Sequence, residues 1–147
     1  EDKDMTVSQL SIFVENKAGK LVEITEVLGR AGIDIRAMSI ADTQDFGILR
    51  LIVSDAEKAK KVLTENGNIV SITKVTAVAV DDKPGALTEV IKLLSDNGVN
   101  IEYMYAFITV SGKHACVVLR VEDNDKAIKL LSEHGIKLVC EEDIKNL

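Results

Sequence analysis

The sequence lacks the features that mark membrane, nucleic-acid-binding and secreted proteins. No apolar run approaches the roughly 20 residues that span a bilayer, and no charged-then-apolar leader opens the chain. The net charge of −6 is shared equally by the two halves, so neither offers a basic surface for phosphate backbones. Cys116 and Cys140 lack CxxC spacing and stand in apolar, strand-like stretches, where a reduced cysteine behaves as a small core residue. We therefore expect a cytoplasmic protein with neither nucleic acid nor membrane as a partner.

Residues that carry catalysis or hold metals are also scarce. The histidines are His114 and His134, and neither lies in a catalytic motif. His134 precedes Gly135 at an expected helix end, where a surface histidine suits the helix dipole. The sequence therefore predicts a protein that is not an enzyme and that carries no metal and no other cofactor.

What the chain does contain is an internal repeat. An offset of 66 residues pairs identical residues, namely Gly19 with Gly85, Leu21 with Leu87, Leu28 with Leu94, Gly32 with Gly98, Ile35 with Ile101 and Met38 with Met104. An offset of 68 then pairs Asp55 with Asp123, Ala59 with Ala127, Leu63 with Leu131 and Gly67 with Gly135. So many identities in one register are hard to assign to chance, so the chain contains two copies of one structural unit. The change of offset places a two-residue insertion between Met104 and Asp123.

Each copy has the hydrophobic pattern of strand, helix, strand, strand, helix and strand. We expect strands near 7–14, 34–41, 47–53 and 69–72 in the first copy, and near 76–80, 100–109, 114–121 and 136–140 in the second. Gly32 and Gly98 are expected to end the first helix of each copy in a left-handed cap, and Gly67 and Gly135 to end the second. Ser54 and Glu57 have capping-box spacing, which predicts a helix start at Ser54. The insertion is expected in the second hairpin, around Ser111-Gly112.

This order of elements predicts an α+β fold of two tandem ferredoxin-like βαββαβ domains, at 5–73 and 74–147. The first range begins at Met5 because the acidic residues 1–4 ahead of it are left out of the fold prediction. In this layout each antiparallel four-stranded sheet has both helices on one face, and the other face stays bare. Because bare faces and edges rarely remain in solvent, we expect sheets to pair side by side or face to face, and the chain to form a homodimer.

The repeated loops ENKAGKL at 15–21 and DDKPGAL at 81–87 each end at a helix N-terminus. Amide hydrogens there lack intrahelical partners, and the helix dipole favours an anion such as a carboxylate. Gly19 and Gly85 would let a ligand approach the backbone closely. Fifteen residues after each glycine stand Asp34 and Asn100. We expect them beside the helix N-terminus, where their oxygens would accept from an ammonium group while the loop amides hold a carboxylate. The alternative is that all four residues only form turns.

NKAGKL followed by GIDI, and DKPGAL followed by GVNI, resemble the ACT domain, a small-ligand regulatory module of amino-acid metabolism. The two copies of this resemblance together cover nearly the whole chain. The chain is also similar to stand-alone bacterial proteins made of two ACT domains. It implies that an amino acid binds near a domain interface, with no catalytic residues. The ligand-binding residues that it implies are Asn16, Gly19, Lys20, Leu21 and Asp34 in the first copy and Asp82, Gly85, Ala86, Leu87 and Asn100 in the second.

The two copies differ where ligand preference would be set. Asp82 would repel a carboxylate where Asn16 can donate to it, so we expect the ligand in the first loop. Tyr103, Tyr105 and Phe107 alternate along one expected strand. This pattern suits packing in the core or at a sheet-to-sheet interface, or a ligand-facing wall. We expect Met38, Ile40, Tyr103 and Tyr105 to form the pocket wall, suited to an apolar or aromatic side chain.

Two functions remain open on the sequence alone. The favoured one is a regulatory protein that senses an amino acid and signals by shifting the geometry of the domains around the ligand. The alternative is an interaction module that no longer binds a ligand and serves to dimerise or to dock on a partner enzyme of amino-acid metabolism. A response of the melting temperature to an amino acid separates the two.

Overall fold

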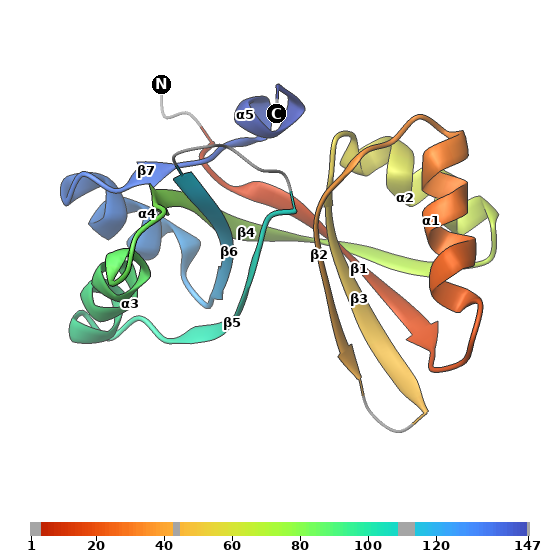
Figure 1. The fold of residues 1–147 in the computed structure, drawn as a ribbon, viewed down its shortest axis with the longest axis horizontal. Helices are drawn as coiled ribbons and strands as arrows, with labels where there is room; N and C mark the ends of the chain where they lie inside the picture. The colour runs from red at the N-terminus through yellow and green to blue at the C-terminus, as the bar shows by residue number, and fades with distance from the viewer. Residues whose placement is uncertain (1–3, 43–44, 109–113, 147) are drawn as a thin grey trace. The chain divides into compact units, whose positions relative to one another are not determined.

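The structure is a computed structural model that describes residues 4–42, 45–108 and 114–146. The chain forms two compact units (Figure 1). The first unit spans Ser8–Thr73, and the second unit comprises the residues up to Val7 and those from Lys74 onward. Strand, helix, strand, strand, helix and strand follow one another twice, which confirms the predicted α+β fold with βαββαβ repeats. The ranges 5–73 and 74–147 as independent domains stay a prediction.

The first unit is a four-stranded sheet with two helices. Its elements are β1 (Val7–Glu15), α1 (Lys20–Arg30), β2 (Ile35–Asp42), β3 (Phe46–Val53), α2 (Ala56–Glu65) and the first part of β4 (Ile69–Asp81). The strand order is β2-β3-β1-β4, and β3 pairs antiparallel with both of its neighbours. Helices α1 and α2 cover the same face of this sheet (Figure 1). Among the described residues of this unit, no helix lies on the opposite face.

The core of the first unit lies between the sheet and its two helices. Alternate strand residues point into it, and the apolar stripes of the helices meet them. The buried members are Leu10, Ile12, Leu49, Leu51 and Val53 from the strands, Ile33 between α1 and β2, and Ile24, Leu28, Ala59 and Leu63 from the helices. Full burial of one large aliphatic side chain contributes about 1.5–3 kcal/mol to stability. The apolar stripe on each helix therefore determines which face of that helix packs against the sheet.

The second unit repeats the arrangement. Its elements are the rest of β4, α3 (Ala86–Asp96), β5 (Ile101–Ala106), β6 (His114–Val121), α4 (Asn124–Glu133), β7 (Lys137–Leu138) and α5 (Glu141–Lys145). Strand β4 pairs antiparallel with β6 and with the short β7, and β5 pairs with β6. Val90, Leu94, Leu119 and Leu131 are among its fully buried core residues. The expected insertion and the Ser111-Gly112 turn lie outside the described residues.

The predicted interruption between the last strand of the first copy and the first strand of the second is wrong. Instead of two strands at 69–72 and 76–80, the chain forms one continuous strand, β4, whose 13 residues pass from the first unit into the second. The physical reason is visible in its sequence, IVSITKVTAVAVD, which contains neither glycine nor proline to end a strand. β-branched residues favour the extended backbone throughout.

The C-terminal strand is shorter than predicted. It is confined to Lys137–Leu138, and a short helix, α5, follows at Glu141–Lys145. Cys140, expected in the strand, is instead the residue before this helix, and its amide donates to Asp143 Oδ2 at 3.0 Å. Acidic residues in the first turn suit the helix dipole, and Ile144 anchors the helix because its side chain is fully buried.

The helix boundaries confirm part of the predicted capping. Gly32 and Gly98 have φ of 73° and so adopt the left-handed conformation predicted after α1 and α3. The predicted start of α2 at Ser54 is wrong by one residue, because Asp55 is the cap and its carboxylate accepts from the Lys58 amide at 3.1 Å. The Ser54 hydroxyl accepts instead from the amide of Asp34 at 2.9 Å.

Candidate functional site

The two repeated loops adopt the same conformation. Gly19 precedes α1 with φ of 91° and Gly85 precedes α3 with φ of 87°, a left-handed conformation that glycine adopts without strain. The first helical hydrogen bond runs from the Glu23 amide to the Gly19 carbonyl at 3.0 Å, and from Glu89 to Gly85 at 3.3 Å. The loops are therefore two copies of one turn.

Helices α1 and α3 begin without a side-chain cap, whereas α2 and α4 have one. The cap residues Gly19 and Gly85 have no side chain to accept from the helix start, and the first amide of each helix donates to a loop carbonyl, Lys20 to Lys17 at 3.4 Å and Ala86 to Lys83 at 3.2 Å. In contrast, Asp55 caps α2 and Asp123 caps α4, each accepting from a main-chain amide at 3.1 Å. Uncapped amides at a helix start carry partial positive charge and bind anions. The repeated loops therefore present the two helix starts where a ligand oxygen can take the place of a capping side chain.

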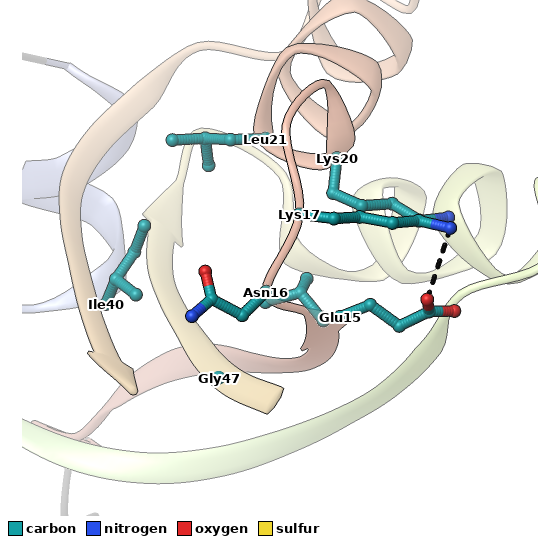
Figure 2. Close-up of a pocket in the computed structure, with 8 residues that line it drawn as sticks. Glu15, Asn16, Lys17, Lys20, Leu21, Ile40 and Gly47 are labelled. Atoms are coloured by element: carbon teal, nitrogen blue, oxygen red, sulfur yellow. Dashed lines mark ion pairs between the residues drawn. The ribbon is translucent and has the colours of Figure 1, made fainter. Parts of the chain in front are cut away.

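The first loop borders a cavity, which we call the loop cavity. Its volume is about 190 Å³, and it is lined by Val14, Glu15, Asn16, Lys17, Lys20, Leu21, Ile40 and Gly47. Figure 2 shows the Asn16 side chain pointing toward the side of Ile40 and Gly47, with the ion pair of Glu15 and Lys17 on the other side. Of the predicted ligand-binding residues of the first copy, the structure brings together Asn16, Lys20 and Leu21 here, next to Gly19 in the chain.

The charged groups of the loop cavity form exposed ion pairs. Lys17 Nζ lies 3.3 Å from Glu15 Oε2, and Lys20 Nζ lies 3.7 Å from Glu23 Oε2. Each of these side chains is about one third exposed or more, and such pairs contribute at most about 1 kcal/mol. Both lysines can therefore exchange their partners for a ligand carboxylate at low cost.

Gly47 lines the loop cavity but was not predicted from the sequence. It lies in β3 opposite Val14 of β1. An added Cβ would come within 3.4 Å of the Ala41 carbonyl oxygen and 3.5 Å of Val14 Cγ2, so a side chain here would crowd this end of the cavity. A glycine inside a β-strand often marks a close approach of this kind, and that was the available signal.

Asp34 lies at the opposite end of the sheet from the loop cavity. Its main chain exchanges two hydrogen bonds with Ser54, each 2.9 Å long, and its carboxylate lies 3.2 Å from Arg36 Nη1. Strand β2 then needs about 17 Å to reach Ile40 at the cavity. The expected position of Asp34 beside the N-terminus of α1 is therefore wrong within one unit, because α1 first carries the chain back along the sheet. Its role as a ligand residue stays a prediction.

The second unit separates its predicted residues in the same way. Asp82, Gly85, Ala86 and Leu87 lie at the β4–α3 loop, and Ala86 lines a cavity of about 400 Å³ there. Asn100 lines a different hollow with Glu102, Glu122 and Asp123 among its neighbours. The register explains the separation, since Asp81 pairs with His114 at one end of β6 and Ile101 pairs with Val121 at the other.

The predicted pocket wall is not brought together in the loop cavity. Ile40 lines the cavity and is 48% exposed. Met38 packs instead against the core of the first unit. Tyr103 and Tyr105 belong to the second unit, where their rings stack with centroids 6.4 Å apart. Of the four predicted residues, only Ile40 therefore contributes to this cavity.

The described residues show neither a metal-binding cluster nor a membrane-spanning helix. Across residues 4–42, 45–108 and 114–146, no group of three or more His, Cys, Asp or Glu side chains is arranged to hold a metal ion. Within the same ranges, no helix is long and apolar enough to cross a membrane.

Comparisons with known proteins identify the family. The model of the ACT domain pair matches residues 5–147. Protein BT0572 from Bacteroides thetaiotaomicron is similar in structure, with a TM-score of 0.91 and 45% identity over 97% of this chain and 98% of that one. The ligand-free regulatory subunit of aspartate kinase from Thermus thermophilus has a TM-score of 0.64 and 15% identity, over 90% and 95% of the two chains. No curated protein matches the sequence. The chain belongs to the family of ACT domain pairs.

Proposed function

We propose that this protein is a regulatory protein that binds a small amino acid in the loop cavity. The observation that carries the proposal is that the uncapped start of α1 borders a cavity, through Lys20 and Leu21. The ligand carboxylate would accept from amides of the first turn of α1 beyond that of Lys20, in the place that Asp55 occupies at α2. Asn16 and Lys20 would add donors on either side of the same carboxylate.

The remaining surface of the loop cavity limits the ligand. Val14, Leu21 and Ile40 supply an apolar side, which favours an aliphatic side chain over a charged one. Drug-sized ligands occupy sites of roughly 300–1,000 Å³, so a cavity of about 190 Å³ favours a small molecule. Glu15 lies at the rim and would accept from the ligand ammonium group. Asp34 would serve the same purpose only from a second molecule of the protein.

The second loop is the weaker site in this proposal. Its residues Gly85, Ala86 and Leu87 present the same uncapped helix start. Asp82, however, replaces Asn16, and a carboxylate side chain repels a ligand carboxylate where an amide donates to it. We therefore assign the amino acid to the first loop.

A ligand screen with an exchanged pair of variants tests the assignment. Thermal-shift measurements with each of the twenty amino acids should reveal one that raises the melting temperature, since a ligand at about 100 times its Kd adds about 2.7 kcal/mol. Asn16→Asp, which installs the residue of the second loop, should abolish the shift. Asp82→Asn is the matched control and should leave it intact. Silence from all twenty amino acids, or equal loss in both variants, would contradict the proposal.

The function as an interaction module has its own support, in an exposed apolar patch on the open face of the first sheet. The aromatic patch consists of Phe13, Phe46, Ile48 and Ile69, which are 50%, 43%, 38% and 73% exposed. The Phe13 and Phe46 rings stack with centroids 4.9 Å apart, and Phe13 faces Ile48 across the β1–β3 pair. Clustered exposed side chains of this size are typical of protein interfaces. We therefore propose a cytoplasmic homodimer that buries this patch, with a partner enzyme as the receiver of the signal.

Sedimentation equilibrium tests the homodimer. The protein should sediment as a dimer at micromolar concentration, and Phe13→Glu should shift it toward monomer. Val22→Glu is a suitable control, because Val22 is 57% exposed on α1 and lies outside the patch. A monomeric parent protein, or equal dissociation by both variants, would exclude the aromatic patch as the dimer interface.

A further inference from the structure

The two histidines of the chain line one cavity in the second unit, although they are 20 residues apart in sequence. His114 opens β6, and His134 follows the last turn of α4. We call this hollow of about 400 Å³ the histidine cavity. It also borders the start of α3 through Ala86, so it lies beside the second of the two repeated loops. Neither the family nor the proposed amino-acid site assigns a role to these two side chains.

The histidine cavity has a balanced charge that protonation would change. The charged and titratable side chains that line it come from four elements and two connecting loops; they are Asp81, Lys83, Glu89, His114, His134 and Lys137. Two lysines offset two carboxylates when the histidines are neutral. Lys83 Nζ lies 3.8 Å from an oxygen of Asp81, and His114 Nδ1 lies 3.9 Å from the other oxygen. Protonation of both histidines therefore changes the formal charge of the lining from zero to +2.

Whether the His134 ring repels or binds an anion depends on the protonation of its Nε2 atom. Its Nδ1 lies 2.9 Å from the carbonyl oxygen of Leu130. Because a carbonyl only accepts, we assign the hydrogen of the neutral ring to Nδ1, which leaves a lone pair on Nε2. A lone pair repels an anion, whereas the protonated ring has an N–H at Nε2 that donates to one. Anion binding at His134 is therefore coupled to protonation.

The first unit has a hollow at the equivalent position with different chemistry. That hollow, of about 240 Å³, is lined by Phe13, Phe46 and Ile69 among others. The repeat offsets place Phe46 where His114 stands and Ile69 where Lys137 stands. Asn66 corresponds to His134 in the same way. At these three positions a titratable or cationic group stands only in the second copy, although Glu15 and Lys20 also line the hollow of the first unit.

From these observations we propose that the histidine cavity is a binding site for a small doubly charged oxyanion, and that it binds when His114 and His134 are protonated. Lys83 and Lys137 attract the anion, and the two imidazolium groups donate to it. Asp81 and Glu89 oppose the anion while the histidines are neutral, which releases it as the pH rises. This site differs in unit, charge and ligand class from the loop cavity, so the two proposals stand or fall separately.

Nuclear magnetic resonance on the intact protein tests the site directly, because two histidines give two sets of imidazole signals. Sulfate is the probe, since it keeps its double charge across the range in which histidine titrates, and chloride at equal ionic strength is the control. At about pH 5.5 both sets should shift together and saturate, and at about pH 8 the affinity should be at least about tenfold weaker. Shifts of one histidine alone, or equal affinity at both pH values, would overturn the proposal.

Variants taken from the first copy separate a site from general attraction to positive charge. His134→Asn leaves the His114 signals to report, and His114→Phe leaves those of His134. Each should weaken sulfate binding about tenfold or more, the effect of losing one charge-assisted hydrogen bond. Lys92→Ala, on the α3 surface in an ion pair with Asp96, is the matched control and should bind as the parent does. Unchanged affinity in either histidine variant would exclude the site.

Discussion

The two capping aspartates, Asp55 and Asp123, allow a sharp test of how the units unfold. Each is the N-cap of the second helix of its copy and accepts from a main-chain amide at 3.1 Å. Replacing such a cap by alanine costs about 1 kcal/mol, because one amide at the helix start loses its partner. We expect Asp55→Ala to destabilise the first unit by this amount and Asp123→Ala to destabilise the second, since each unit has its own core.

Native-state hydrogen exchange resolves the two units in one experiment. A loss of about 1 kcal/mol raises the open population about fivefold, and slow amides that exchange through that opening should accelerate to the same extent. In Asp55→Ala the change should appear around Leu63, which is fully buried in α2. Amides around its counterpart Leu131 in α4 should keep their rates. Asp123→Ala should give the opposite pattern.

Two outcomes would refute this reasoning. Equal acceleration around Leu63 and Leu131 in either variant would mean that the units open together, so that the predicted ranges 5–73 and 74–147 are not independent domains. Asp55→Asn is the control for the cause, because asparagine caps about as well as aspartate. If it destabilised the protein as much as alanine does, the hydrogen bond to the Lys58 amide would not be the source of the effect.

Three further predictions concern single side chains. Gly19→Ala and Gly85→Ala should each lower the free energy of unfolding in urea by about 1–2 kcal/mol. Backbone strain alone would cause the loss, because an added Cβ meets no atom within 4 Å. A negligible loss would contradict the left-handed conformation. Burial raises the pKa of the Cys116 thiol, so less thiolate forms and its reaction with a disulfide reagent at about pH 8 should be slower than that of free cysteine; an equal rate would refute the burial. Hydrogen bonds from the Thr6 hydroxyl and then its amide lower the pKa of Asp4, so the stability gained from the ionised carboxylate is lost as pH falls through that lowered value. Thr6→Val should raise this pKa in an NMR titration, and an unchanged value would show that the hydroxyl is not the cause.

Much of the fold could be predicted because its determinants are local. The alternation in β1 and the helical spacing of Ile24 and Leu28 each specify one buried face, and both residues are buried as their spacing indicates. Gly32 and Gly98 end their helices because each adopts a left-handed backbone conformation, which depends on that residue alone. The end of the first repeat was harder, because strand β4 continues through a boundary that the repeat pattern places near residue 73. A repeat shows where sequence similarity begins again, and backbone conformation need not change there.

The site could be predicted only as far as it is local. Asn16, Lys20 and Leu21 lie on one short loop, so the sequence alone brings them together. Ile40 and Gly47 reach the same cavity through the register of three strands, in which Val14 faces Gly47. The prediction for Asp34 is wrong for a related reason. The residues between Gly19 and Asp34 form helix α1, which carries the chain back to the other end of the sheet. Spacing in sequence gives distance in space only within one element.

Comparison of the two copies adds information that neither copy carries alone. Positions that are identical in both, such as Gly19 and Gly85, have the same backbone geometry and therefore report on the fold. Positions that differ on that shared backbone report on chemistry, because the environment is nearly matched while the side chain changes. Asn16 against Asp82 in the loops leads to the choice of carboxylate site. Phe46 against His114 leads to an apolar surface in one unit and a protonatable cavity in the other. A duplicated domain thus supplies its own control variants, and exchanging these residues between copies tests each assignment with the least change in fold.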